Sequence, residues 1–190
     1  MASGCFVRRF FVSRFPLVWF RLDGRRRLHT SLLPRCGVAY DSYELSDIVD
    51  PRVGDYSVYV LPNAFSLSDG EEAAIARLEA AGKRIVRIPE PIGVDELRAR
   101  LASAGAHVYL DTDDVVFAGR GYLTVHASKA GAKRIRLPYS CDIKEIFGAA
   151  PERKGVTEFV EEMAFGETMV YAISQPWQET VWGKPCGDSR

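Results

Sequence analysis

The chain has 190 residues, 47% of them hydrophobic, as is ordinary for one packed domain or two small ones. The formal net charge of zero conceals an asymmetry, because eight arginines and one aspartate give residues 1–35 a charge of +7 and leave −7 on the remainder. A mildly acidic body argues against a nucleic-acid partner. No run approaches the ~18 apolar residues of a transmembrane helix, which argues against a membrane partner.

Residues 1–35 form a segment of their own, rich in arginine and aromatic residues, without glutamate and interrupted by Pro16. This composition predicts a basic extension outside the fold, disordered or non-native. An organellar transit peptide or a membrane-surface helix is one alternative, and a folded arm is another. A secretory signal fits worst, because arginines interrupt any apolar stretch that it would need.

Residues 36–105 carry the pattern of an α/β layer. The apolar run at 56–61 predicts a strand buried on both faces. Ser68 and Glu71 have capping-box spacing at the start of a helix over 68–81, and Gly82 is placed to end it. A strand at 83–88 and a second helix at 94–103 follow. A crossover this short predicts parallel strands with right-handed connections.

After residue 105 the helical period disappears and short apolar runs alternate with turn residues. Such spacing predicts an antiparallel β-sandwich over 106–174, followed by a tail at 175–190. The fold class we expect is therefore α/β, a partial flavodoxin-like parallel layer followed by a small antiparallel β-sandwich domain. The expected strands are 107–110, 115–118, 122–127, 134–137, 142–147, 156–161 and 168–173.

The order of these elements resembles the C-terminal part of β-galactosidase-type glycoside hydrolase-like proteins. The resemblance covers residues 36–173 and rests on GVAYDSYELSDIVD, YSVYVLPNAFSLSDGEEAAI, GKRIVRI, HVYLDTDDVVFAGRGYLTVHASKAGAKRIRLP, DIKEIFG and FGETMVYAI. It implies half of a class I glutamine amidotransferase-like, trimerisation-like domain and a terminal β-domain. The family's catalytic barrel has no counterpart here, so the chain looks like the end of a longer protein. The partners implied are a second copy or a glycoside hydrolase-like barrel.

The loops after the two predicted parallel strands are where α/β folds usually bind ligands. Asn63 and Glu90 are the candidate ligand-binding residues there, although a turn residue and a solvated loop carboxylate are their structural alternatives. Neither loop has Cys, Ser or His. Pro89 and Pro91 flank Glu90, and proline lacks the N–H that an oxyanion hole needs. We therefore expect no catalytic residue.

Other polar residues have structural interpretations. The acidic run at 111–114 lacks the spacing of a calcium loop and predicts a hairpin turn between strands 107–110 and 115–118. His107 and His126 are expected to be core or surface histidines. Glu158 and its acidic neighbours at 161–162 lie on a predicted strand, whereas the glutamates of the resembled family belong to its barrel. No metal site is predicted.

The four cysteines are far apart and form no CxxC pair: Cys5, Cys36, Cys141 and Cys186. Zinc sites need closer clusters, and disulfide scaffolds are short and dense in cysteine. Isolated cysteines are more often reduced packing residues. We therefore expect no cofactor and a reducing, cytoplasmic location.

Three functions remain open. The leading hypothesis is a non-catalytic accessory or assembly module, a remnant or fragment of a glycoside hydrolase-like protein. Its surface could contact other subunits, because half an α/β sheet leaves unpaired strand edges. The second is a carbohydrate-binding module in which Tyr122, Tyr139 or Trp177 stacks on sugar rings. The third is a small hydrolase or amidotransferase-like enzyme, which needs a nucleophile or carboxylate pair that the sequence does not display.

Overall fold

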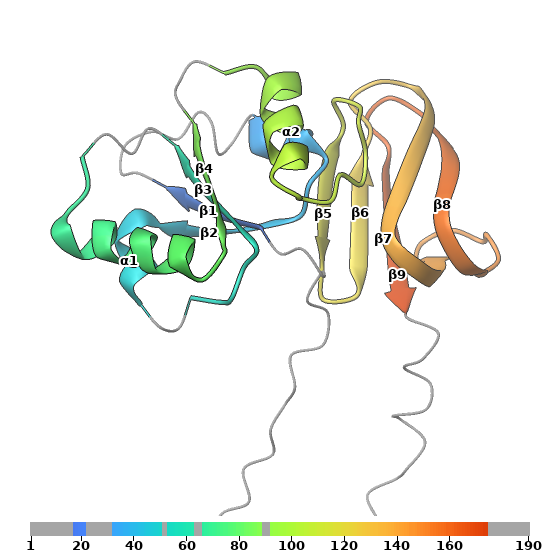
Figure 1. Cartoon of the computed structure of the whole chain (residues 1–190). Coiled ribbons are helices and arrows are strands. Elements are labelled where there is room, and N and C mark those ends of the chain that lie inside the picture. The colour runs from blue at the N-terminus through green and yellow to red at the C-terminus, as the bar shows by residue number, and fades with distance from the viewer. Residues whose placement is uncertain (1–16, 22–31, 51–52, 63–65, 89–91, 175–190) are drawn as a thin grey trace, which may run out of the picture.

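In the residues that it describes, the computed structural model has a parallel sheet with four short helices and an antiparallel sheet (Figure 1). Strands predominate over helices in its regular structure. Within the described residues no helix is long and apolar enough to cross a bilayer. The structure describes residues 17–21, 32–50, 53–62, 66–88 and 92–174.

The first sheet has four parallel strands in the order β2-β1-β3-β4. The expected strands at 56–61 and 83–88 correspond to β3 and β4. The strands are β1 (Leu17–Arg21), β2 (Tyr40–Glu44), β3 (Val58–Pro62) and β4 (Arg84–Ile88).

The position of β1 differs from the expectation for residues 1–35. The composition of that segment predicts a place outside the fold, yet Leu17–Arg21 lies between β2 and β3 and pairs with both. The physical reason is that β3 is buried along its whole length and therefore needs a hydrogen-bonding neighbour on each side. The apolar run LVWF is the part of the segment suited to that position.

Helices cover both faces of the parallel sheet. Val58 and Val60 of β3 pack with η2 (Leu33–Cys36) and α2 (Val94–Ser103). The alternate residues of β3 pack with η3 (Leu45–Val49) and α1 (Asp69–Ala80). Because successive side chains of a strand point to opposite faces, one buried strand supplies both cores.

The two α-helices begin and end close to where the sequence predicts. The Ser68 backbone N–H donates to Oε2 of Glu71 at 2.7 Å, and the Glu71 N–H donates to Ser68 Oγ at 3.4 Å, which confirms the capping box. Gly82 follows α1 with a φ of 76°, the left-handed conformation that ends many helices. Helix α2 spans the predicted residues.

The second sheet has five antiparallel strands in the order β5-β6-β9-β7-β8. Strand β7 joins the two expected strands at 134–137 and 142–147 into one, with a register irregularity between Arg136 and Cys141. It pairs with β8 on both sides of this irregularity, and its end also pairs with β9. The strands are β5 (Val115–Gly119), β6 (Tyr122–His126), β7 (Gly131–Glu145), β8 (Arg153–Met163) and β9 (Thr168–Ser174).

The expectation of a strand at 107–110 is wrong. Val108 forms only an isolated bridge with Val38, and β5 pairs with β6 instead. The segment connects the two sheets, and its buried residues Tyr109 and Leu110 belong to the core of the antiparallel sheet. An apolar run of four residues is short enough to serve either as a strand or as such a connection.

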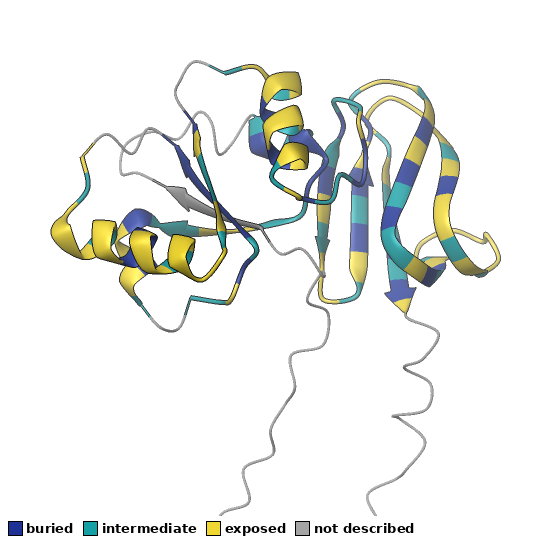
Figure 2. Ribbon diagram, in the orientation of Figure 1, coloured by how far each residue is buried: buried dark blue, intermediate teal, exposed yellow. Residues whose placement is uncertain are grey.

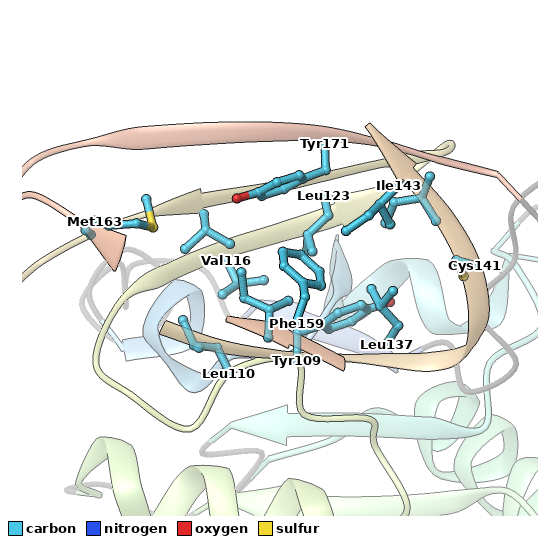
Figure 3. Close-up of a cluster of buried hydrophobic side chains, with 14 residues drawn as sticks. Tyr109, Leu110, Val116, Leu123, Leu137, Cys141, Ile143, Phe159, Met163 and Tyr171 are labelled. Carbon is cyan, nitrogen blue, oxygen red and sulfur yellow. The ribbon is translucent and has the colours of Figure 1, made fainter. Parts of the chain in front are cut away.

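The core of the antiparallel sheet lies between its two curved halves, where Tyr109, Val116 and Phe159 converge (Figure 3). Phe159 and Tyr171 meet edge to face, with ring centroids 5.1 Å apart. Burial alternates along much of β7 and along the second half of β8 (Figure 2). In β7, Ile135 and Leu137 face the core as the alternating pattern predicts.

Candidate functional site

The two candidate ligand-binding residues, Asn63 and Glu90, lie outside the described residues, as does Trp177. Strand β3 ends at Pro62 and the neighbouring β4 ends at Ile88, so the two loops leave the same edge of the sheet. This shared edge is where ligands usually bind in parallel α/β sheets.

A cluster of charged and polar side chains lies where the two sheets meet. Asp113 on the connection before β5 forms an ion pair with Arg35 of η2, with 2.6 Å between Nη2 and Oδ2. The Arg35 Nε–H also donates to the Asp113 carbonyl at 3.2 Å. Two donors of one guanidinium therefore hold the connection against the helical layer.

Arg98 of α2 is the second part of this junction, and only 11% of its side chain is exposed. Its guanidinium donates to the carbonyls of Arg35 and Thr112, each at 3.0 Å, and to that of Cys36 at 3.3 Å. It also forms an ion pair with Asp95 at 2.6 Å. One side chain thus connects α2, η2 and the segment that enters the antiparallel sheet.

Asp114 and Lys133 form the buried part of the junction. The Lys133 Nζ lies 2.9 Å from Oδ2 of Asp114, and both residues are more than nine-tenths buried. Thr112 Oγ1 donates to the same oxygen at 2.5 Å, and the Ser128 backbone N–H donates to the other at 2.7 Å. Burial raises the pKa of Asp114, but these donors outweigh it and hold the pKa below its usual value.

Backbone contacts complete the junction. The Tyr109 N–H donates to the Gly37 carbonyl at 2.7 Å, and the Arg136 N–H donates to the Tyr109 carbonyl at 2.8 Å. Gly37 has a φ of 68°, and a Cβ at this position would lie 1.8 Å from the Leu110 carbonyl oxygen. Only glycine fits so close a crossing of two backbones.

The expectation of a hairpin turn at 111–114 is therefore replaced by a charged connection. The carboxylates of Asp111, Asp113 and Asp114 each have a basic partner. The partner of Asp111 is Arg136, whose Nη1 lies 2.9 Å from Oδ2. No group of three or more His, Cys, Asp or Glu side chains suited to a metal ion occurs among the described residues. Sequence reasoning missed Arg35, Arg98 and Lys133, although Lys133 shares a face with Ile135 and an inward lysine requires a buried counterion.

No protein-family model, curated protein or solved structure matches this chain.

The two cysteines in the described residues are free and buried. Burial raises the pKa of the Cys36 thiol to about 12 and that of Cys141 to about 11. A nucleophilic cysteine needs a lowered pKa and access to solvent. Both thiols therefore serve as packing groups, as their isolation in the sequence predicts.

The two histidines have local partners. The Nε2–H of His107 donates to the Arg136 carbonyl at 3.0 Å, and its ring meets Tyr109 edge to face with centroids 4.6 Å apart. Desolvation by burial lowers the pKa of His107. His126 on β6 is exposed, and its Nδ1 lies 2.7 Å from Thr168 Oγ1 on β9.

Glu158 and Glu161 of β8 are not placed as a catalytic pair. Glu158 points outward and lies 3.1 Å from the guanidinium of Arg134, whereas Glu161 shares the inner face with Phe159 and bonds to Arg153. Glycoside hydrolysis by paired carboxylates requires both groups to flank one bond. Their odd spacing on a strand directs Glu158 and Glu161 to opposite faces.

A small hollow opens where β7, β8 and β9 approach one another. Its volume is about 50 Å³, which holds a few water molecules and is far below the several hundred Å³ of pockets for organic ligands. Burial raises the pKa of Tyr171, one of its walls. The hollow is lined by Ile143, Glu145, Ala150, Pro151, Arg153, Glu161, Met169 and Tyr171.

Two exposed aromatic side chains share the outer face of the antiparallel sheet. Phe117 on β5 is opposite Thr124 on β6, and Tyr122 lies two residues before Thr124 on the same face. Phe117 is 53% exposed and Tyr122 is 52% exposed. Tyr139, the other predicted stacking residue within the described chain, is half-buried and contacts the sheet's core.

Proposed function

We propose that this chain is a non-catalytic accessory or assembly module, built like the C-terminal region of β-galactosidase-type glycoside hydrolase-like proteins. The strand order β2-β1-β3-β4 supports the resemblance, because flavodoxin-like sheets have the order 2-1-3-4-5. On this proposal the parallel layer is a flavodoxin-like unit with four strands. The five-stranded antiparallel sheet corresponds to the small β-domain that follows it.

The junction between the sheets is the observation that carries the proposal. Arg98 binds three backbone carbonyls from two segments, and the buried Asp114–Lys133 ion pair joins the same connection to β7. Buried charge pairs contribute little net stability but favour one defined arrangement of the groups around them. A module that holds partner subunits needs its surfaces in such a fixed arrangement. The partner proposed is a glycoside hydrolase-like barrel, with self-association as the alternative.

The test uses the full chain, purified with an affinity tag. An extract of its own source cells is passed over the immobilised chain, and retained activity on nitrophenyl β-galactoside is measured. We expect retained galactosidase activity above that on a resin carrying an unrelated protein, and no turnover by the purified chain alone. Turnover by the purified chain would overturn the non-catalytic assignment, and an extract that loses no activity to the resin would overturn the barrel partner. Light scattering of the chain alone then reports self-association.

A second candidate function, carbohydrate binding, is favoured by the shared outer face of Phe117 and Tyr122. Neighbouring aromatic rings on a flat strand pair offer apolar surface to the faces of sugar rings. Affinity electrophoresis in gels containing a soluble β-glucan or galactan tests it. Retardation that Tyr122→Ala removes supports the candidate, provided that Phe165→Ala, an exposed aromatic elsewhere, leaves it intact. Equal mobility with and without polysaccharide excludes these ligands.

The buried thiols of Cys36 and Cys141 support a reducing compartment, and we place the protein in the cytoplasm. Neither proposed function requires a cofactor.

A further inference from the structure

Strand β4 forms one end of the parallel sheet and pairs only with β3 among the described residues. The Arg84 N–H donates to the Ser57 carbonyl at 3.0 Å, so this residue points its backbone groups toward β3. Because these groups alternate along a strand, Val86 and Ile88 also face β3. The N–H and C=O groups of Ile85 and Arg87 therefore face outward.

The side chains of this edge are basic on both faces. Arg84 lies on the same face of the sheet as Val86, which packs with α2. Arg87 lies on the opposite face, with Ile85, which packs with α1. Both arginines are exposed, and neither forms an ion pair within the described chain. Most arginines of that chain are paired with carboxylates: Arg35, Arg98, Arg100, Arg134, Arg136 and Arg153.

We propose that the edge of β4 binds an extended acidic segment of a partner protein by strand addition. The segment's backbone pairs with the outward groups of Ile85 and Arg87. Its side chains alternate between the two faces of the sheet, so carboxylates three residues apart point to opposite faces. That spacing equals the spacing of Arg84 and Arg87, and it defines the partner as an extended chain with acidic residues at positions i and i+3.

The charges favour this occupant over a second copy. Antiparallel pairing of β4 with β4 of another chain would bring four unpaired guanidinium groups to one edge, and like charges across strands oppose pairing. An acidic segment neutralises two of them. The proposal goes beyond the accessory role, because it holds for any protein that supplies such a segment.

The experiment measures binding to the full chain by fluorescence anisotropy. The probe is a fluorescein-labelled octapeptide of threonine and valine with glutamates at its third and sixth positions. Control peptides carry glutamine at both positions, or glutamates at the third and fifth. We expect the i,i+3 probe to bind at least about five times more tightly than either control, since each exposed ion pair contributes a few-fold in affinity. We expect its advantage over the glutamine peptide to shrink in 0.5 M salt.

Variants separate charge from strand addition. Arg84→Gln and Arg87→Gln should each weaken binding about threefold, and Lys154→Gln, which removes an exposed charge from β8, should not. Arg87→Pro also removes an outward N–H without touching the ladder to β3, so it should weaken binding more than Arg87→Gln. Amide exchange supplies the direct readout, because the N–H groups of Ile85 and Arg87 should gain protection when the peptide binds.

Four results would overturn the proposal. One is equal affinity for all peptides. Another is binding without protection of Ile85 and Arg87. The third is no binding at millimolar peptide concentration. That result would mean that the two arginines only prevent other strands from pairing with the edge of β4. A dimer of the unliganded chain that Arg87→Pro dissociates would assign the edge to a second copy instead.

Discussion

The ammonium group of Lys133 lies 2.9 Å from the carboxylate of Asp114, and both side chains are buried. Lys133 comes from β7, and Asp114 from the connection that leads out of the parallel layer. The pair therefore fixes the connection to β7 of the antiparallel sheet. Thr112 and Ser128 also donate hydrogen bonds to the Asp114 carboxylate, so both of its oxygens have partners.

Replacing Lys133 by methionine should destabilise the protein by about 3 kcal/mol, because it leaves a buried carboxylate without its counterion. The methionine keeps the length and apolar contacts of the lysine stem, so the loss reports the charge. Urea unfolding followed by far-ultraviolet circular dichroism measures it. Lys154→Met, the same change on an exposed residue of β8, is the control and should alter stability by less than about 0.5 kcal/mol. Equal effects of the two variants would show that the buried pair has no special role.

The junction also shows which contacts can be predicted from the sequence and which cannot. Local signals were sufficient for α1, because Ser68 and Glu71 lie three residues apart and complete each other's hydrogen bonds. Arg35 and Asp113 are 78 residues apart, and the sequence around either residue does not predict that the other is its partner. The order of the sheet is equally non-local, since β1 lies between β2 and β3, which follow it in the sequence.

The two incorrect strand predictions, at 107–110 and in β7, have the same cause. A short apolar run shows that its side chains are buried, but not whether its backbone pairs in a ladder. In β7, Pro138 and the residues after it look like a turn in the sequence, whereas the sheet absorbs them as an irregularity within one long strand. Tertiary pairing decides both cases.

Gly37→Ala should destabilise the protein by about 3 kcal/mol, the range of substitutions that combine backbone strain with a steric clash. The added methyl would lie 1.8 Å from the Leu110 carbonyl oxygen, and the residue has a positive φ. Gly82→Ala separates the two causes, because Gly82 has a φ of 76° but no atom lies within 4 Å of the place that a Cβ would take. That variant should lose only about 1 kcal/mol. Thermal unfolding of both variants gives the comparison, and equal losses would mean that the two backbones can move apart.

Cys36 and Cys141 should resist alkylation in the folded protein. Burial raises the pKa of their thiols to about 12 and about 11, so few thiolates form at pH 8 and those few are shielded from reagent. Iodoacetamide treatment followed by peptide mass mapping resolves each cysteine separately. We expect little modification of these two in buffer and complete modification in 8 M urea. Rapid modification of Cys36 in buffer would show that η2 opens from the layer.

Lowering the pH from 7.5 to 5 should destabilise the protein through His107. Desolvation by burial lowers the pKa of this histidine, so the folded state binds a proton less readily than the unfolded chain. The stability that the neutral ring contributes is therefore present above the unfolded pKa of about 6.5 and declines as the pH falls below it. Protonation keeps the Nε2–H bond to the Arg136 carbonyl but places a charge in the half-buried contact with Tyr109.

The stability difference between wild type and His107→Gln should therefore shrink between pH 7.5 and pH 5, because glutamine has no proton to gain and retains an amide donor for the Arg136 carbonyl. Urea unfolding at half-unit steps of pH gives this difference directly. Proton NMR titration of the His107 ring checks the cause independently, since its midpoint in the folded protein should lie below that in urea. A midpoint above the unfolded value would reverse the sign, because the charged ring would then stabilise the junction and acid would strengthen the fold across this range.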